Sequence, residues 1–378
     1  MLDLATVGPA ARASRWLGDY GATVVKVGAV PSREGVQINP VFHAYSGQRG
    51  VQRVLLDLKA PEGREVFLRL AERAAVVIES FRPGVVARLG IGYDDVRAVN
   101  PGIVYCSTSG YGQDGPHAAW AGHDLNYLAV GGFLDCSGRR PGGQPPIPGA
   151  TVADSAGGGM HAVIAILAAL VRRATAGEGA YLDVSAADGI LALMAIQVDE
   201  YLAVGTLPGP GSNILTGRYA CYDTYQASDG GWLSIGVIEP RFWANLCRAL
   251  GLERWTGHQS EDGVQDEIRA DLEQVFRART RDEWVAELGP ADTCVAPVLS
   301  VPEVVDDPQF VARGAVVEAV HPEHGRFRQV GPVLAGMTRP DGPYELRDAS
   351  VTDTHDLLAA AGFTPAECAK LRDAGVVA

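Results

Sequence analysis

Residues 22–27 read Ala-Thr-Val-Val-Lys-Val, a β-rich run that directly follows a helical stretch at 10–20. The same alternation returns downstream, where 61–74 has helical periodicity and leads into Val-Val-Ile-Glu at 76–79. Another β-rich run follows at 102–107. Strand-like runs that alternate with helices are typical of βα units around a mostly parallel sheet. The stretch therefore predicts an α/β fold.

The domain organisation is indicated by a change of composition near the middle of the chain. Pro and Gly are dense at 205–217, which is typical of a linker or an exposed loop. A long apolar helix at 155–175 precedes this segment, and a mixture of strands and helices follows it. The predicted parts are a large domain at 1–205 completed by 326–378, a linker at 206–221, and a smaller α+β domain at 222–325.

Composition excludes several classes of partner. The formal net charge of -13 argues against a nucleic-acid surface and against binding to anionic membranes. The six cysteines are far apart, with no spacing typical of metal ligands, so we expect reduced thiols and no metal site. The longest apolar run, at 162–171, is about half of the ~20 residues that a membrane span needs. We therefore expect a cytoplasmic protein with no membrane insertion.

Asp154 lies at the start of the long apolar helix, where two interpretations are open. It is either an N-cap carboxylate that accepts hydrogen bonds from first-turn amides, or a functional acid. Gly157, Gly158 and Gly159 follow it, and glycine is costly in a helix by ~1 kcal/mol relative to Ala. Such a run favours close approach of a ligand to the backbone, near the positive end of the helix. The spacing also fits a dinucleotide turn, but only a short run precedes it, which argues against one.

Two other ionisable positions stand out. His123 is preceded by a glycine and followed by Asp124, with Tyr127 nearby. An isolated histidine is more often structural, although its ordinary pKa of ~6.5 suits proton transfer at neutral pH. Glu239 ends a β-like run and precedes Pro240, a position at which a glutamate usually interacts with the helix dipole.

Taken together, these segments resemble the class III CoA-transferase superfamily, over essentially the whole chain. The motifs that carry the resemblance are, in order, Leu-Asp-Leu at 2–4, Leu-Gly-Asp-Tyr-Gly-Ala-Thr-Val-Val-Lys-Val at 17–27, Leu-Asp-Leu-Lys-Ala-Pro-Glu-Gly at 56–63, Glu-Ser-Phe-Arg-Pro-Gly at 79–84, Gly-Tyr-Gly-Gln-Asp-Gly-Pro at 110–116, the Asp154 loop, and Gly-Glu-Gly at 177–179. The resemblance implies a large Rossmann-like domain, a smaller α+β lobe and an interlocked homodimer. It also implies an acyl-CoA thioester as substrate, with no cofactor beyond its coenzyme A moiety.

The superfamily contains two enzymatic branches that use the carboxylate at the position of Asp154. In the transferase branch it is the nucleophile, and in the α-methylacyl-CoA racemase branch it is one of two acid/base groups. His123 and Asp124 resemble the racemase branch, in which Glu239 supports the histidine. We therefore favour a racemase that inverts C2 of a 2-methyl-branched acyl-CoA. A transferase with Asp154 as nucleophile, and a catalytically silent acyl-CoA-binding protein, remain as alternatives.

The resemblance also maps contacts to coenzyme A and shows two departures. The mapped residues are Val7, Leu56, Lys59, Ser80, Phe81 and Arg88. After Lys26-Val27 the family usually has an acidic and then a basic residue, whereas Gly28 and Ala29 stand here, and Arg33 is a candidate for the missing cation. Arg218 stands where a small residue is common, and we expect it to reshape the acyl pocket or to meet a substrate carboxylate.

Overall fold

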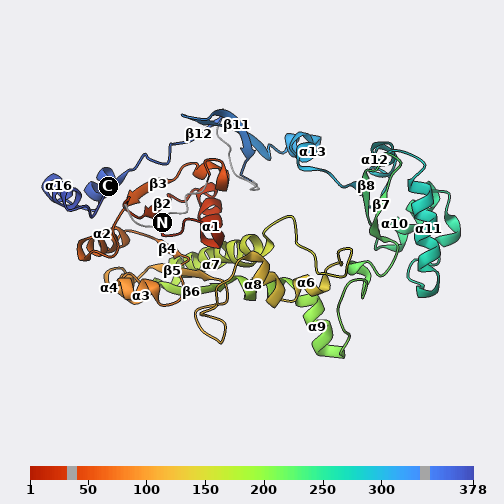
Figure 1. The fold of residues 1–378 in the computed structure, drawn as a ribbon, viewed down its shortest axis with the longest axis horizontal. Helices are drawn as coiled ribbons and strands as arrows, with labels where there is room; N and C mark the ends of the chain where they lie inside the picture. The colour runs from red at the N-terminus through yellow and green to blue at the C-terminus, as the bar shows by residue number, and fades with distance from the viewer. Residues whose placement is uncertain (32–40, 333–340) are drawn as a thin grey trace. The chain divides into compact units, whose positions relative to one another are not determined.

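The computed structural model describes residues 1–31, 41–332 and 341–378. The chain forms two compact units, each built from more than one segment (Figure 1). The large unit contains Met1–Gly131, Pro148–Met194 and Pro308–Ala378, and the small unit contains Gly132–Ile147 and Ala195–Asp307. Each unit has its own hydrophobic core.

A six-stranded parallel sheet forms the centre of the large unit. Across the sheet the strands are β3 (Gln52–Leu55), β2 (Val25–Gly28), β1 (Leu2–Asp3), β4 (Val76–Glu79), β5 (Val104–Ser109) and β6 (Ala180–Ser185). The chain adds strands on one side of β1 and then reverses to add β4, β5 and β6 on the other side. This is the strand order of Rossmann folds, in which ligands bind at the carboxyl ends of the strands near the reversal. The predicted α/β fold is confirmed.

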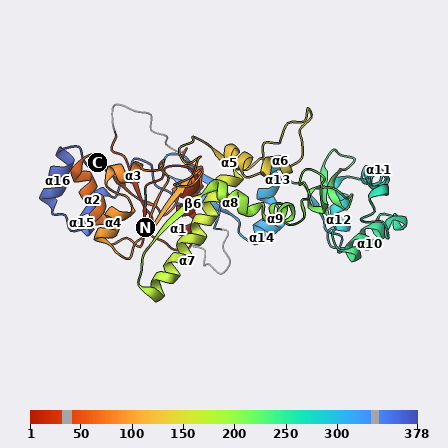
Figure 2. The ribbon, with the colours of Figure 1, turned by 90° about the horizontal axis from the view of Figure 1, so that it is seen from below.

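Helices cover both faces of this sheet (Figures 1 and 2). One face carries α1 (Gly8–Asp19), the π-helix η2 (Ala153–Met160) and α7 (His161–Ala176); the other carries α2 (Pro61–Ala71), α4 (Tyr93–Val99), α15 (Thr354–Ala360) and α16 (Pro365–Asp373). Side chains of each strand point alternately to the two faces. In β4, Val77 packs into one core, whereas Val76 and Ile78 pack into the other. A sheet covered on both faces explains why the central strand β4 begins with a continuous apolar run, Val-Val-Ile.

A second sheet of the large unit lies in the C-terminal part of the chain. The remaining elements of this unit are η1 (Ala44–Gln48), α3 (Val85–Leu89), α5 (Asp124–Val130), α8 (Ala186–Leu193), α14 (Pro308–Ala312), β10 (Val316–His321), β11 (Gly325–Val330) and β12 (Tyr344–Glu345). Strand β10 pairs with β11 antiparallel and with β12 parallel. Arg49 also donates a hydrogen bond to the Val330 carbonyl at 2.8 Å. The small unit therefore ends at Asp307, earlier than the boundary at 325 that the sequence led us to expect.

The small unit is an α+β arrangement around an antiparallel sheet. Its elements are α6 (Phe133–Cys136), α9 (Ala195–Val204), η3 (Ile214–Thr216), β7 (Tyr222–Gln226), β8 (Trp232–Gly236), α10 (Pro240–Ala249), η4 (Glu253–Trp255), η5 (Asp262–Val264), α11 (Gln265–Phe276), α12 (Arg281–Leu288), β9 (Val295–Pro297) and α13 (Val301–Asp306). Strand β8 lies between β7 and β9. Trp243, Phe276 and Leu233 are fully buried in its core.

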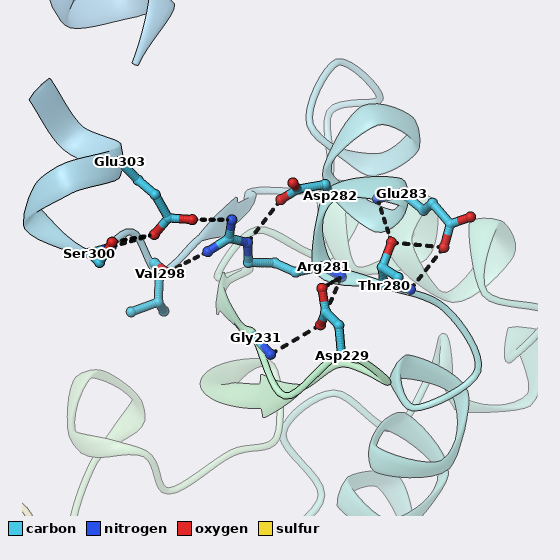
Figure 3. Close-up of polar contacts among 9 residues, drawn as sticks. All are labelled: Asp229, Gly231, Thr280, Arg281, Asp282, Glu283, Val298, Ser300 and Glu303. Carbon is cyan, nitrogen blue, oxygen red and sulfur yellow. Dashed lines mark hydrogen bonds and ion pairs between the residues drawn. The ribbon is translucent and has the colours of Figure 1, made fainter. Parts of the chain in front are cut away.

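Arg281 forms hydrogen bonds that connect three segments of the small unit (Figure 3). Its guanidinium donates to Glu303 at 2.5 Å and to the Val298 carbonyl at 3.2 Å, while its backbone N–H donates to Asp229 at 3.3 Å. The hydrogen bond from Arg281 lowers the pKa of Glu303 to about 2. These contacts connect the start of α12 to α13 and to the β7–β8 turn.

Candidate active site

The residues mapped to coenzyme A lie mostly at the carboxyl edge of the parallel sheet. Val7 comes after β1 and directly precedes α1, Lys59 lies between β3 and α2, and Ser80 and Phe81 directly follow β4. Arg88 lies in α3, which is the next helix after β4. Val7, Lys59, Ser80 and Arg88 are exposed, and Phe81 is half-buried. The carboxyl edge next to a reversal in strand order is the usual ligand site of such sheets.

Leu56 differs from the other mapped residues because its side chain belongs to the core. It is 1% exposed and packs with the apolar side chains of the face that α2 and α15 cover. Its backbone N–H donates to the Gly28 carbonyl at 2.8 Å. The structure therefore gives Leu56 a packing role.

A cavity of about 400 Å³ opens at the carboxyl ends of β1, β2 and β3. Gly28 and Ala29 line it, at the position where the sequence departs from its family. Arg53 and Arg347 also line it, and neither was predicted from the sequence. Arg53 donates to the Asp348 carbonyl at 3.0 Å, and burial together with the like charge of Arg347 lowers its pKa. Arg33, the cation expected from the sequence, lies outside the described residues.

A buried carboxyl group supports the segment that follows β4. Glu79 is 1% exposed and accepts a hydrogen bond from the backbone N–H of Phe81 at 2.6 Å. Burial raises its pKa to about 7, although hydrogen bonds from Ser107 and Phe81 act in the opposite direction. The backbone of the segment mapped to coenzyme A is thus held by a hydrogen bond to a buried carboxyl group whose pKa is raised to about 7.

His123 is exposed at the start of α5. Its backbone is extended, and its N–H donates to the Asn126 side chain at 3.0 Å, which closes the first turn of the helix. One turn later, the Tyr127 hydroxyl donates to the Gly122 carbonyl at 2.6 Å. A Cβ at Gly122 would lie 2.7 Å from the Tyr127 ring, so this glycine lets the ring pack beneath the histidine segment. The imidazole is therefore held on an ordered turn and faces outward.

Asp154 is not the capping residue of its helix. The helix begins at Val152, and the backbone N–H of Asp154 donates to the Asp124 carboxylate at 2.8 Å. Asp124, from the first turn of α5, thus acts as the capping group from a different element. This arrangement joins the two segments that the sequence singled out and leaves the Asp154 carboxylate for another role.

The charges around Asp154 form one cluster within the large unit. Burial raises the pKa of Asp154, and the neighbouring Asp124 carboxylate adds to the rise. Arg12 and His123 act in the opposite direction. Arg12 was not predicted from the sequence, although an arginine in the second turn of α1, directly after Gly-Pro-Ala-Ala, was a usable signal. A half-buried carboxyl with a raised pKa beside a histidine suits proton transfer.

The three glycines after Asp154 have a packing role that the sequence did not reveal. A Cβ at Gly157 would lie 2.7 Å from the Ala186 carbonyl, one at Gly158 would lie 2.7 Å from Pro9, and one at Gly159 would lie 2.9 Å from Trp16. These glycines therefore allow η2 to fit between α1 and α8. They lie beyond the first helical turn, so the amides near Asp154, rather than those of the glycines, are at the helix N-terminus. A π-helical segment is itself uncommon and frequent at functional sites.

The remaining predicted residues belong to the small unit. Glu239 is exposed and directly precedes α10, and its predicted support of His123 stays a prediction. Arg218 donates to both carboxylate oxygens of Asp262, at 2.9 and 2.8 Å. Its charge is thus already paired within the small unit, so the expected contact with a substrate carboxylate has no support here. Among residues 1–31, 41–332 and 341–378, no group of His, Cys, Asp and Glu is placed to hold a metal ion.

The helix that carries Asp154 is longer than the apolar run in the sequence. Within the described part of the chain, Ala153–Ala176 is one helical segment with the length and composition of a membrane span. It also packs against α1, β5 and β6. One such segment is weak evidence for a span, and the predicted cytoplasmic location stays a prediction.

Curated relatives cover the whole chain. Alpha-methylacyl-CoA racemase of Homo sapiens is 32% identical over 100% of this chain and 96% of its own length. Succinate–glutarate CoA-transferase of Agrobacterium fabrum is 30% identical over 84% of this chain and 83% of its own length. Names of both kinds thus occur at similar identity.

Solved structures and a family profile give the same assignment. A CAIB/BAIF family protein from Brucella suis has a TM-score of 0.74 at 29% identity and covers 96% of this chain and 97% of its own. Rv3272 from M. tuberculosis has a TM-score of 0.76 at 27% identity, with coverage of 94% and 96%. The profile of CoA-transferase family III matches residues 1–345. The chain therefore belongs to CoA-transferase family III and is an enzyme of that family.

Proposed function

We propose that this enzyme is an acyl-CoA racemase that inverts C2 of a 2-methyl-branched acyl-CoA. The observation that carries the proposal is the link between His123 and Asp154. Asp124 directly follows His123 and accepts the hydrogen bond from the Asp154 backbone, which brings an imidazole and a half-buried carboxyl into one cluster. The 32% identity to racemases over the full chain also supports it.

Inversion needs one group that removes the C2 proton and another that returns a proton to the opposite face. In one direction His123 accepts the proton, the electron pair of the C–H bond moves onto the thioester oxygen, and Asp154 donates its proton to C2. In the other direction the two groups exchange roles. Burial raises the pKa of Asp154 above its ordinary value, which favours its protonated form more than in an exposed aspartate. Glu239 is proposed to support the imidazolium form of His123, as the family resemblance implies.

The proposed substrate is held by its coenzyme A moiety, and we propose no further cofactor. Lys59 and Arg88 are exposed cations at the carboxyl edge of the sheet, and their proposed role is to bind phosphates. The cavity lined by Arg53 and Arg347 lies at the same edge and is proposed to receive the nucleotide end. The net charge of the protein repels the ligand, so local cations carry the binding.

The second candidate is a CoA-transferase in which Asp154 is the nucleophile. It is supported by CoA-transferases of this family at 27 to 31% identity. Asp154 then attacks a thioester carbonyl, forms an anhydride and releases coenzyme A thiolate. In this mechanism His123 has no required proton to transfer. A catalytically silent acyl-CoA-binding protein, with Asp154 and His123 both structural, is the remaining alternative.

Deuterium incorporation separates these functions. The protein is incubated with a 2-methylacyl-CoA in heavy water, and deuterium at C2 and the configuration at C2 are followed together. We expect both to change in the wild type, whereas His123→Ala loses inversion but still binds the thioester. His355→Ala is the matched control, because His355 is an exposed histidine in α15, on the other side of the sheet. Inversion that survives in His123→Ala rules out the two-base mechanism.

Trapping at Asp154 tests the transferase directly. Hydroxylamine added during turnover with an acyl-CoA and a carboxylate acceptor converts an anhydride or thioester at Asp154 to a hydroxamate, which mass spectrometry detects. A hydroxamate at Asp154 in wild type and in His123→Ala establishes the second candidate. Absence of deuterium exchange, inversion and hydroxamate, together with binding of acyl-CoA, establishes the silent binder.

We also propose that the enzyme is a homodimer. Met160, Ile164, Leu167 and Val171 recur at helical spacing along η2 and α7, and all four are exposed. A continuous exposed apolar stripe on a helix is typical of an interaction surface. Sedimentation equilibrium at micromolar concentration should give twice the chain mass of 39.8 kDa. Ile164→Asp should shift the measured mass toward that of a single chain. A monomeric wild type contradicts the proposal.

A further inference from the structure

Arg12 lies in the first turn and a half of α1, next to the helix that carries Asp154. The two helices approach closely, since Gly158 packs on Pro9 and a Cβ at Gly159 would lie 3.3 Å from the Arg12 Cβ. The Arg12 guanidinium donates to the Thr151 hydroxyl at 2.7 Å. Thr151 lies three residues before Asp154, so the guanidinium is placed at the start of the catalytic helix.

Aromatic packing and burial fix the position of this guanidinium. It lies over the Tyr45 ring, 5.5 Å from the ring centroid, and the Tyr45 hydroxyl accepts a hydrogen bond from the Gly8 N–H at 3.0 Å. Tyr45 has a left-handed backbone (φ 50°), which is strained for a bulky residue and occurs preferentially at functional sites. The Nε atom of Arg12 is buried without a hydrogen-bond partner.

Two other arginines with a buried, unpartnered Nε provide a comparison. Arg15 and Arg49 both form ion pairs with Asp19, so each of them has a carboxylate in direct contact. Among the residues that the structure describes, Arg12 forms no ion pair with a carboxylate. The charge of Arg12 acts on Asp154 without a direct ion pair. A partly buried guanidinium in this situation is stabilised further when an anion binds to it directly. Its fork of donors matches oxygen anions such as carboxylates and enolates.

We infer that Arg12 binds an oxyanion of the substrate beside Asp154. The inference rests on the proposed function, in which this oxyanion is the enolate oxygen of the thioester. When the C2 proton moves to the base, its electron pair shifts through C1 to the thioester oxygen, and the Arg12 N–H groups donate to that oxygen. When the acid returns a proton to C2, the charge leaves the oxygen and the carbonyl is restored. In the transferase alternative, the oxyanion is a carboxylate oxygen of the acyl acceptor.

The charge balance near Asp154 agrees with this assignment. Asp124 and Asp154 are two carboxyl groups within one cluster, and Arg12 and His123 are the groups whose charge opposes theirs. A substrate oxyanion that entered this cluster without Arg12 would face two carboxyl groups. With Arg12 it meets a positive charge held in place by Thr151 and Tyr45, which needs little reorganisation during the reaction.

Binding measurements test the inference without turnover. Acetoacetyl-CoA has an acidic C2 proton and forms a stable enolate that absorbs in the near ultraviolet. In the wild type we expect it to bind more tightly than coenzyme A and as the enolate. In Arg12→Met the preference over coenzyme A should fall by about 10²-fold, the usual loss for one oxyanion donor. The affinity for coenzyme A itself should stay within about twofold, because Arg12 is not among the residues mapped to it.

Matched variants and a second probe make the outcome decisive. Arg97→Met removes an exposed arginine that covers Tyr93 in α4, and it should leave both affinities unchanged. Arg12→Lys keeps the charge without the fork, so an intermediate preference is expected, and it replaces Arg12→Met if that variant does not fold. In the second arm, succinate is titrated onto the enzyme saturated with coenzyme A. If Arg12→Met loses the preference for acetoacetyl-CoA, the oxyanion that Arg12 binds is the enolate. If Arg12→Met loses succinate binding, this oxyanion is the carboxylate of the acyl acceptor. If neither differs from Arg97→Met, the inference is overturned.

The failure of the racemase proposal can be recognised separately. If the wild type shows no deuterium exchange at C2 but Arg12→Met loses succinate binding, the racemase fails and the assignment of Arg12 stands. If the wild type exchanges and inverts C2, and Arg12→Met retains both the rate and the preference for acetoacetyl-CoA, the racemase stands and Arg12 has only a packing role.

Discussion

Glu79→Gln should remove a specific pH dependence of stability from the large unit. Glu79 is buried at the end of β4 and accepts the hydrogen bond from Phe81. Glutamine preserves an oxygen acceptor for this N–H and has nearly the same volume, but it does not titrate. The substitution therefore isolates the contribution of the ionisable group.

The magnitude follows from the pKa of Glu79. Burial raises it from the ordinary value of 4.5 to about 7. Each tenfold change in proton affinity is worth about 1.4 kcal/mol, so the wild type gains about 3 kcal/mol when this carboxyl is protonated. Because the pKa is raised in the folded state, this contribution is complete below about pH 4.5. It is lost as the pH rises through 7.

The assay compares wild type and Glu79→Gln at pH 5 and pH 8. Unfolding in urea is followed by hydrogen exchange of peptides that cover β4 and β5, because the two units need not unfold together. We expect the stability difference between wild type and variant to change by about 2.5 kcal/mol between the two pH values, with the wild type relatively weaker at pH 8, because a part of the contribution is already lost at pH 5. Glu65→Gln, an exposed glutamate of α2, is the control and should show almost no change. A difference independent of pH, or one of opposite sign, refutes the reasoning.

Three further predictions follow from contacts described above. Gly158→Ala should lower the free energy of unfolding by about 1–3 kcal/mol in urea, because its Cβ would lie 2.7 Å from the proline of α1, whereas Gly149→Ala has open space and should be neutral. Arg88→Ala should weaken coenzyme A in calorimetry and flatten the decline of affinity with salt; equal affinity and equal salt dependence would remove Arg88 from the site. Asp124→Ala should cost about 1 kcal/mol of stability through the lost helix cap, and Asp124→Asn should recover most of it; a variant as stable as wild type contradicts the capping role.

Much of the fold was accessible from local sequence patterns. The apolar run at 76–79 and the helical periodicity at 61–74 correspond to β4 and α2. These elements have one clear periodicity each and clear ends, since a proline begins α2 and a buried strand reads as continuous apolar residues. The strand order was not accessible, because the reversal at β1 depends on contacts between residues far apart in the chain.

The site was accessible in its residue types but less so in its physical roles. His123 and Asp154 were singled out as neighbours of glycines and acids, and the structure links their two segments through Asp124. Their catalytic roles stay predictions. The glycine run was attributed to ligand approach, whereas Gly158 fits against a helix of distant sequence. A missing Cβ has the same sequence signature whether a ligand or a second helix occupies the space. Glu79 was missed because its role depends on burial. Arg12 was missed because its role depends on contacts with residues far away in the sequence and on the absence of a direct ion pair.

The discontinuous large unit has a consequence for biosynthesis. The end of strand β3 is joined by residues from the far end of the chain, since the backbone N–H of Asp57 donates to the Val376 carbonyl at 2.8 Å and Leu56 forms a bridge with Val377. A ribosome that has synthesised β1 to β6 has therefore not yet supplied the residues that complete one face of the sheet. Most of the small unit, by contrast, is one uninterrupted segment, Ala195–Asp307. Domains generally fold as units during synthesis. The small unit is thus able to reach its final packing first. The parallel sheet of the large unit, although synthesised earlier, is completed only when the C-terminal segment has been made.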